Sequence, residues 1–119
     1  MELEKLALEV SAAKAGLKPV SPNVLRGDSG IEHRVSLLFT DGTTKFGFDF
    51  YETVTEIEVV RSFAKRFDTK TTINLVCLSG EATPGARKLA NDYGMKVLSP
   101  KAAENFFVFE QASPKPTED

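Results

Sequence analysis

The sequence predicts an α/β protein with a mixed central β-sheet and helices on both faces. Residues 31–51 have the pattern of strand, tight turn and strand, because apolar and polar residues alternate there with the period of two that a strand has. From residue 53 onward, helical and strand-like patterns alternate, which is typical of parallel strands joined by helices. A hairpin followed by such crossovers gives antiparallel and parallel neighbours in one sheet, and the crossovers should be right-handed.

Length and composition indicate a single globular domain. The 119 residues are enough for a core without disulfides or a structural metal, and we expect this domain to span residues 1–111. Residues 112–119 are proline-rich and polar, which predicts a disordered tail. No apolar run approaches the ~18 residues needed to cross a bilayer and no signal-peptide pattern opens the chain, so we expect a cytoplasmic protein without a membrane partner.

Net charge and cysteine content exclude several classes of function. A formal net charge of −2 argues against a generally cationic protein that coats nucleic acid, although a local basic patch is compatible with it. One histidine and one cysteine cannot form a zinc site of the usual kind. Cys77 lies within an apolar run, and we expect a buried structural thiol there.

The first thirty residues predict a helix, a short strand and a loop. Residues 2–15 should form an amphipathic helix that ends at Gly16. Its predicted buried stripe consists of Leu3, Leu6, Ala7, Val10 and Ala13. Residues 17–20 should form an edge strand, because Pro19 cannot donate to a central ladder. Residues 21–30 are expected to form a polar loop.

The hairpin at residues 31–51 carries the residue that most needs an explanation. Asp41-Gly42 is a strong turn signal, and three phenylalanines alternate with other residues on the second strand. Asp49 is a lone carboxylate in this aromatic strand. It is either a metal ligand or a carboxylate hydrogen-bonded to the loop after residue 27 or to a helix N-terminus. His33 shares the apolar face of the first strand and is expected to be a satisfied core or edge histidine.

The second half of the chain predicts three helices that alternate with two strands. Thr53 with Glu56 and Thr55 with Glu58 both fit a capping box at the start of the first of these helices. The predicted buried stripe of this helix consists of Ile57, Val60, Phe63, Ala64 and Phe67.

The remaining elements follow from apolar runs and helix-capping signals. Residues 73–78 form a near-continuous apolar run, as expected of a strand covered on both faces. Residues 81–93 predict a helix with a threonine at the N-cap, a proline at the first position and a glycine after its end. A short buried strand at residues 95–98 and a last short helix should follow, and the apolar residues 106–109 must cover an apolar surface.

This order of elements resembles the restriction-endonuclease-like fold of the PD-(D/E)xK nucleases, whose core has the order αβββαβα. It looks most similar to Mrr-type endonucleases and archaeal Holliday-junction resolvases. The resemblance rests on LEKLALEVSAAKAGLKPV as the opening helix, on the GIEHRVSLLF/KFGFDFY hairpin, and on INLVCLSGEATPGARKLANDYGMKVLS as strand, helix and closing strand. The resemblance covers residues 3–99. It is a match in the order of helices and strands, and not in invariant sequence motifs.

The resemblance implies a definite chemistry. In this family, an Asp on the first hairpin strand and an Asp or Glu on the second bind a divalent cation, usually Mg²⁺. The ion polarises the phosphodiester and activates a water molecule. A Lys two residues after the second carboxylate helps to orient the water, and a Glu on the first helix often supplements the site.

Only some of the carboxylates carry over to this chain. Asp49 matches the second carboxylate, and Glu4 matches the helix glutamate, with Glu9 as the second choice. The first-strand position falls on Ser36, or on Glu32 if the strand is registered four residues earlier, and periodicity does not decide between these registers.

The family's lysine position departs from the pattern. Tyr51 stands there, and a phenol with a reference pKa near 10 carries no charge at pH 7. Lys45 lies on the same strand face as Asp49 but on the wrong side of it. Lys65, on the following helix, could reach back to the site, as the lysine does in some members of this superfamily.

Three functions remain open. The first hypothesis is a nuclease-fold protein with a degenerate catalytic site and no cofactor, which binds DNA or a protein of DNA metabolism or transcription. The second is an active endodeoxyribonuclease or junction resolvase that uses Mg²⁺ or Mn²⁺. Its catalytic set would be Glu4, Glu32, Asp49 and Lys65, with Asp49 and Glu32 as metal ligands. The third is an assembly protein unrelated to nucleic acid, for which the Phe-rich segment at residues 106–109 would supply the surface.

Basic side chains suggest how DNA could be held. The predicted phosphate contacts are Arg26, Arg34, Arg61, Lys65 and Arg66. The last three could equally be a solvated helix face beside acidic residues. Because dimers are common among the resolvases that the chain resembles, a homodimer is also expected.

Overall fold

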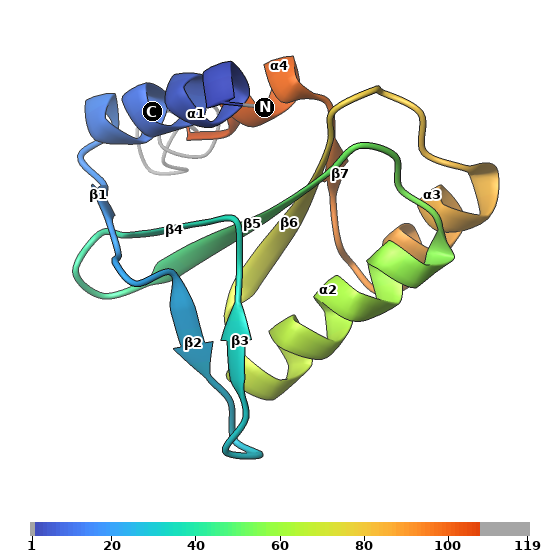
Figure 1. The fold of residues 1–119 in the computed structure, drawn as a ribbon, viewed down its shortest axis with the longest axis horizontal. Helices are drawn as coiled ribbons and strands as arrows, with labels where there is room; N and C mark the ends of the chain where they lie inside the picture. The colour runs from blue at the N-terminus through green and yellow to red at the C-terminus, as the bar shows by residue number, and fades with distance from the viewer. Residues whose placement is uncertain (1, 108–119) are drawn as a thin grey trace, which may run out of the picture.

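The computed structural model describes residues 2–107 (Figure 1). Helices and strands alternate much as the sequence predicts. The elements are α1 (Glu2–Lys14), β1 (Lys18–Pro19), β2 (Val24–Arg26), β3 (Glu32–Arg34), β4 (Leu37–Thr40), β5 (Lys45–Tyr51), α2 (Glu56–Thr69), β6 (Thr72–Cys77), α3 (Pro84–Asp92), β7 (Val97–Leu98) and α4 (Pro100–Glu104).

A five-stranded mixed sheet forms the centre of the molecule, in the order β1-β4-β5-β6-β7. The β1–β4 and β4–β5 pairs are antiparallel, whereas the β5–β6 and β6–β7 pairs are parallel. Helices α1 and α4 lie on one face of this sheet, and α2 and α3 lie on the other (Figure 1). The predicted α/β fold with a mixed sheet and helices on both faces is therefore confirmed, and β1 lies at the sheet edge as Pro19 indicates.

Helix caps agree with the sequence in most places. Thr55 and Glu58 form the predicted capping box of α2, which decides between the two candidate boxes. The Thr83 hydroxyl accepts a hydrogen bond from the backbone N–H of Ala86 at 3.1 Å and so caps α3. These caps satisfy backbone donors that a helix N-terminus otherwise leaves unpaired.

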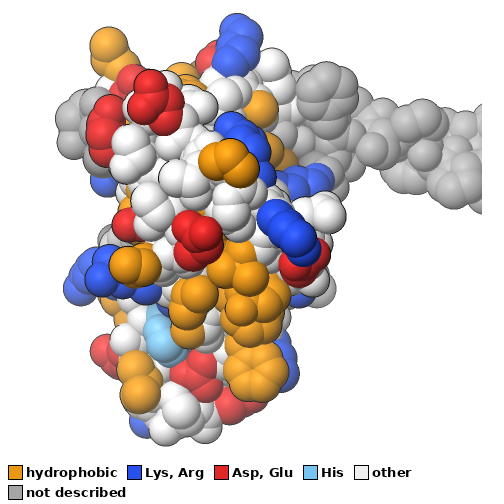
Figure 2. All heavy atoms as spheres, turned by 90° about the vertical axis from the view of Figure 1, so that its right-hand side faces the viewer, with side chains coloured by type: hydrophobic (Ala, Val, Ile, Leu, Met, Phe, Trp, Pro, Cys, Tyr) orange, Lys and Arg blue, Asp and Glu red, His pale blue; other side chains and the backbone are white. Residues whose placement is uncertain are grey.

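The buried face of α2 differs from the prediction. Val59 and Ser62 face the sheet and are buried, whereas four of the five apolar residues expected in the core, Ala64 among them, lie on the surface. Ile57 is 61% exposed, Val60 47% and Phe67 65%. Figure 2 shows apolar side chains gathered on this side of the molecule. Helix α2 has apolar residues on two faces. The face with the more regular spacing, which the sequence predicts to be buried, points outward.

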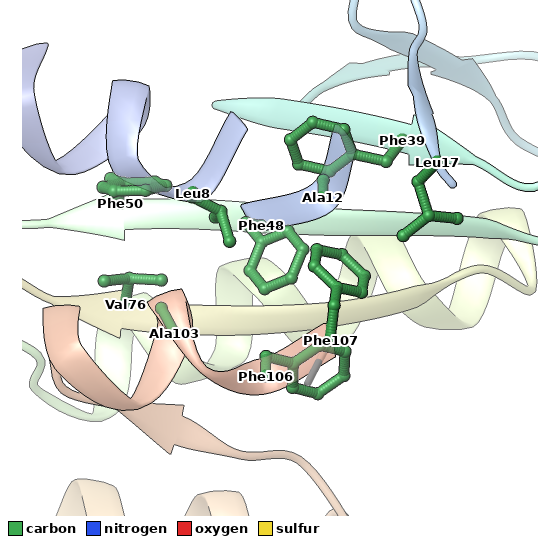
Figure 3. Close-up of a cluster of buried hydrophobic side chains, with 10 residues drawn as sticks. All are labelled: Leu8, Ala12, Leu17, Phe39, Phe48, Phe50, Val76, Ala103, Phe106 and Phe107. Atoms are coloured by element: carbon green, nitrogen blue, oxygen red, sulfur yellow. The ribbon is translucent and has the colours of Figure 1, made fainter. Parts of the chain in front are cut away.

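The face of the sheet toward α1 and α4 has an aromatic core (Figure 3). The Phe48 ring packs nearly perpendicular to those of Phe106 and Phe107, with centroids 5.5 Å and 5.7 Å away, an arrangement that aromatic quadrupoles favour. Phe39 adds a third edge-to-face contact to Phe48. The prediction that residues 106 and 107 cover an apolar surface is confirmed, while 108–109 and the predicted tail at 112–119 lie outside the described residues.

The opposite face of the sheet has its own core beneath α2 and α3. Val59, Leu75 and Cys77 belong to it, and the burial of Cys77 agrees with the prediction. Because side chains alternate along a strand, β5 sends Phe48 to the α1 side and Asp49 to the α2 side. This alternation places the carboxylate of Asp49 directly under α2.

The predicted stripe of α1 is also wrong. Leu8, Ser11 and Ala12 are buried, whereas Leu3 is 78% exposed and Leu6 54%. Helix α1 has apolar residues on more than one of its faces, so their periodicity alone does not identify the face that packs on the sheet. The hydroxyl of Ser11, which donates to the backbone carbonyl of Glu104 in α4 at 2.5 Å, helps to fix the orientation that the structure adopts.

The first hairpin strand is not continuous. Residues 32–34 form β3, which pairs with β2 in a separate two-stranded sheet, and only β4 joins β5. The chain bends at Val35 and Ser36, where the N–H of Val35 donates to Asn23 and that of Ser36 to Phe48. Strand β2 lies within residues 21–30, which the sequence predicted to be a loop. Three residues are too short a run for a periodicity signal.

Asp68, in the last turn of α2, fastens the two-stranded sheet to the rest of the fold. Its carboxylate accepts hydrogen bonds from the Ser29 backbone N–H at 2.9 Å and hydroxyl at 2.6 Å, and its Oδ2 lies 2.8 Å from His33 Nε2. A Cβ on Gly27 would lie 1.9 Å from the same carboxylate, so the chain needs glycine there. Hydrogen bonds from Ser29, and then from His33, lower the pKa of Asp68 to about 2.

This lowered pKa predicts a pH dependence of stability. A carboxyl group with an ordinary value of 3.8 that falls to about 2 on folding stabilises the fold fully above pH 3.8 and loses that effect as the pH falls toward 2. Asp68→Asn should therefore be less stable than the wild type at neutral pH, and the difference should shrink through this acidic window. Urea unfolding across pH measures it. Asp92→Asn, on an exposed pair, is the matched control. A difference that does not change with pH would contradict this role.

Candidate nucleic-acid interface

A pocket of about 350 Å³ opens between β5, α2 and the bend that joins β3 to β4. It contains the residue that the sequence analysis singled out. The residues that line it are Lys5, Asn23, Arg34, Val35, Ser36, Asp49, Phe50, Tyr51 and Lys65.

Asp49 lies in this pocket with its carboxylate almost fully enclosed. The residue is 3% exposed, and its Oδ2 accepts a hydrogen bond from the Ser62 hydroxyl at 2.6 Å. The Lys65 ammonium lies 3.1 Å from both carboxylate oxygens and also donates to the backbone carbonyl of Arg34 at 2.8 Å. An ammonium group has three donors, and these contacts use them. Asp49 and Lys65 thus form a hydrogen-bonded ion pair in which the carboxylate is buried and the lysine side chain is 21% exposed.

Ser36 and Tyr51 are the residues that the resemblance places at two positions where the family pattern has charge. The Ser36 hydroxyl accepts a hydrogen bond from the Phe50 backbone N–H at 2.9 Å. The Tyr51 hydroxyl lies 3.3 Å from the Ser62 hydroxyl. Burial, and then the negative charge of Asp49, raise the pKa of Tyr51, so its hydroxyl stays protonated and neutral.

Ser36 and Glu32, the two candidate positions on the first hairpin strand, lie in different parts of the structure. Ser36 lies against β5, because its N–H donates to the Phe48 carbonyl at 2.9 Å. Glu32 is exposed and pairs across the small sheet with Arg26. Of the two candidate positions for a first-strand carboxylate, Ser36 therefore lines the pocket and Glu32 does not.

The predicted set of acidic metal ligands does not assemble. On α1 it is Lys5, and not Glu4 or Glu9, that lines the pocket. Within residues 2–107, no three Asp, Glu, His or Cys side chains lie close enough to share a metal ion. The expectation that Glu4, Glu32 and Asp49 converge is therefore wrong, while the predicted approach of Lys65 to Asp49 is present in the structure.

The five residues predicted to contact phosphate also do not lie together in the structure. Arg34 and Lys65 line the pocket, whereas Arg26 and Arg61 are exposed and are not part of its lining. Arg66 points elsewhere, since its Nη1 donates to the Tyr93 carbonyl at 2.7 Å. Its guanidinium also lies 5.8 Å from the centre of the Phe63 ring, a cation–π contact on the far side of α2.

Sequence reasoning missed three residues of the site. Ser62 holds Asp49, and Lys5 brings a second ammonium to the lining. Asn23 supports the bend, because its side-chain amide donates to the Val35 carbonyl and its Oδ1 lies 3.5 Å from Arg34 Nη1. The signal available for Ser62 was a small polar residue three positions after Val59 and directly before Phe63, but the wrong choice of buried face concealed it.

The arrangement favours binding of an anion. Three cationic side chains, those of Lys5, Arg34 and Lys65, line the pocket together with one carboxylate, that of Asp49. Since Asp49 is already neutralised by Lys65, the remaining charge of the pocket is positive. Cationic side chains beside hydroxyl and amide donors are the groups that proteins use to contact phosphate.

No protein family matches the sequence, and no curated protein is similar to it. Several solved structures are similar. AF1548, a protein of unknown function, matches with a TM-score of 0.64 at 14% identity, over 96% of this chain and 68% of that one. A repair endonuclease from Pyrococcus abyssi matches with a TM-score of 0.54 at 16% identity, over 83% and 46%. EndoMS in its apo form gives 0.52 at 16% identity, over 82% and 43%.

These structures define the class of fold. The chain is an α/β protein with a mixed five-stranded sheet, and it has the restriction-endonuclease-like fold of nuclease structures. It spans less than half the length of EndoMS and of the Pyrococcus enzyme. At such low identity the likeness shows the fold, and the narrower resemblance to Mrr-type endonucleases and Holliday-junction resolvases stays a prediction. No helix within residues 2–107 is long and apolar enough to span a membrane.

The ion pair makes a prediction about stability. Lys65→Met should destabilise the fold by about 2 to 4 kcal/mol, because it leaves the Asp49 carboxylate buried without its cation. The double variant Asp49→Asn/Lys65→Met should recover a large part of this loss, since no uncompensated charge remains. Denaturant unfolding of the single and double variants measures the coupling.

Lys88→Met provides the matched control. Lys88 forms an exposed pair with Asp92 at 3.2 Å, and such pairs contribute less than about 1 kcal/mol. If Lys65→Met were as mild as Lys88→Met, or if the double variant showed no recovery, the pair would not be the buried contact described above.

Proposed function

We propose that this chain is a nuclease-fold DNA-binding module in which the Asp49–Lys65 ion pair takes the place of a metal centre. One observation carries the proposal. The carboxylate that the family would use as a metal ligand is 3% exposed and already bonded to Lys65 and Ser62. A carboxylate held in this way stabilises the fold, and the net charge of the other side chains in the pocket is positive.

A catalytic Mg²⁺ does not fit the donors of the pocket. The ion requires near-octahedral oxygen coordination and usually takes one or two carboxylates from the protein. Among residues 2–107, Asp49 is the only acidic residue in the lining, and the ammonium of Lys65 lies within hydrogen-bonding distance of both of its oxygens. Ser36 and Tyr51 contribute neutral hydroxyls in place of further charge. We therefore derive no hydrolytic step for this site.

A phosphate group of DNA does fit the remaining charge. Arg34 and Lys5 line the pocket together with the neutral polar side chains of Asn23 and Ser36, a combination suited to a phosphodiester. The comparisons support nucleic acid as the source of that phosphate, because EndoMS has been solved in complex with double-stranded DNA. That structure matches with a TM-score of 0.50 at 16% identity, over 82% of this chain and 43% of EndoMS.

An active endonuclease is the competing function, and one contact favours it. Lys65 reaches Asp49 from α2, as a displaced catalytic lysine would. This reading still needs a second carboxylate, and Glu32 is exposed on the separate two-stranded sheet. The missing ligand is the reason for preferring a binding role.

The proposal predicts salt-dependent binding of DNA through the pocket. Fluorescence anisotropy of labelled duplex DNA, measured over a series of NaCl concentrations, should show affinity that falls as salt rises. Arg34→Gln and Lys5→Gln should each weaken binding and reduce the slope of log K against log[salt] by about 1. Lys101→Gln, an exposed lysine of α4 outside the pocket, should change neither.

Two results would contradict the proposal. Binding that is equally strong in Arg34→Gln, Lys5→Gln and wild type would remove the pocket as the interface. Cleavage of supercoiled, single-stranded or junction DNA with Mg²⁺ or Mn²⁺ that is abolished by Asp49→Ala would establish the competing function.

A further inference from the structure

A second pocket, of about 320 Å³, opens at the amino ends of the parallel strands β5 and β6. We call it the amino-end pocket. Its walls come from the starts of these two strands, the last turn of α2, the loop between α3 and β7, and the segment after α4. It shares no lining residue with the pocket around Asp49. Its volume lies at the lower end of the range for small-molecule sites.

Asn74 is the residue of the amino-end pocket that the fold alone does not explain. It is 3% exposed, and its side-chain Nδ2 has no hydrogen-bond partner within residues 2–107. Its neighbours along β6, Ile73 and Leu75, are buried and apolar. A buried amide without a partner costs free energy that a leucine of similar volume would not cost. Such a group in a core strand indicates a partner from outside the described chain.

The charged side chains of the pocket are hydrogen-bond donors. The guanidinium of Arg66 is held in place, because Nη1 donates to the Tyr93 carbonyl at 2.7 Å and the group lies 5.8 Å from the centre of the Phe63 ring. That hydrogen bond uses one of the five N–H donors of the group. Lys96 adds a second positive charge at the exposed rim, and no acidic side chain of residues 2–107 belongs to the lining. The pocket therefore complements a negatively charged acceptor.

The rest of the lining is largely apolar and limits the kind of anion. Met95 and Phe106 are buried, and Phe46 is half-buried. A strongly hydrated ion such as inorganic phosphate would lose its hydration against these walls. A carboxylate on a small apolar group matches both parts of the lining. Its planar pair of oxygens suits a guanidinium, and its apolar part replaces water against the aromatic and aliphatic side chains.

We infer that the amino-end pocket binds a small organic carboxylate. Its oxygens accept hydrogen bonds from Arg66 and from the amide of Asn74, and its apolar part lies against Met95 and Phe106. The inference is independent of the proposed function, because none of these residues lines the pocket assigned to DNA. It also gives a reason for an asparagine in a core strand. The unpaired amide lowers the stability of the free protein and gains its partner when the ligand binds.

Titration of the isotope-labelled chain with sodium benzoate at constant ionic strength, followed by NMR, tests the site. Benzoate should cause saturable shifts of the Asn74 side-chain amide signals and of the Met95 and Lys96 backbone amides. Benzamide has a similar shape without the charge, and it should bind roughly tenfold more weakly because the charge-assisted hydrogen bonds to Arg66 are lost. Inorganic phosphate should cause no saturable shift at these residues.

Asn74→Leu separates ligand recognition from stability. It should raise the dissociation constant for benzoate by roughly tenfold and yet keep or raise the melting temperature, because it removes an unpaired donor from the interior. Arg66→Gln should weaken benzoate binding by a similar factor. Arg87→Gln is the matched control, since Arg87 is an exposed arginine of α3 outside the pocket, and it should leave the affinity for benzoate unchanged.

Several results would overturn the inference. One is an Asn74→Leu variant that melts at a lower temperature and binds benzoate as the wild type does, since the amide would then have a structural role. The others need only the wild-type chain. They are the absence of a saturable shift with benzoate, equal or tighter binding of benzamide or phosphate, and nuclear Overhauser contacts that identify a water molecule as the only partner of the Asn74 amide.

Discussion

The ammonium group of Lys65 joins three parts of the fold at one point. It contacts the carboxylate of Asp49 on β5 and the backbone carbonyl of Arg34 at the end of β3, while its own backbone belongs to α2. A buried carboxylate is costly unless it is paired and hydrogen-bonded, so α2 must lie where Lys65 and Ser62 can reach Asp49. The contacts that make the carboxylate tolerable in the interior are the same contacts that occupy its oxygens. The same contacts therefore position α2 and engage both oxygens of Asp49.

The sheet could be predicted from the sequence because its strands follow physical rules that act locally. Period-two alternation defined β5, and a continuous apolar run defined β6. The exposed and buried faces of α1 and α2 could not be predicted, because both helices are apolar on more than one side and only packing selects between them. Strand β2 escaped detection since its three residues pair with β3 through tertiary contacts.

The candidate site was predictable in part for the same reason. Asp49 was identified because a carboxylate in an aromatic strand violates the local pattern, and Lys65 because a lysine on the next helix can reach it. Glu32 was misplaced because the register of a strand cannot be read through a bend, and the chain bends at Val35. Ser62 belongs to a face of α2 that the sequence did not distinguish. Helix α2 contributes Val59 to the core and Lys65 to the pocket, and it also has apolar residues on its exposed face.

Crystals of the protein soaked in Mn²⁺ and examined by anomalous scattering provide the most direct test of the closed ion pair. We expect no Mn²⁺ at Asp49, with the Lys65 ammonium still within hydrogen-bonding distance of both carboxylate oxygens. A Mn²⁺ ion ligated by Asp49 together with a second acidic side chain, with Lys65 displaced, would contradict the account.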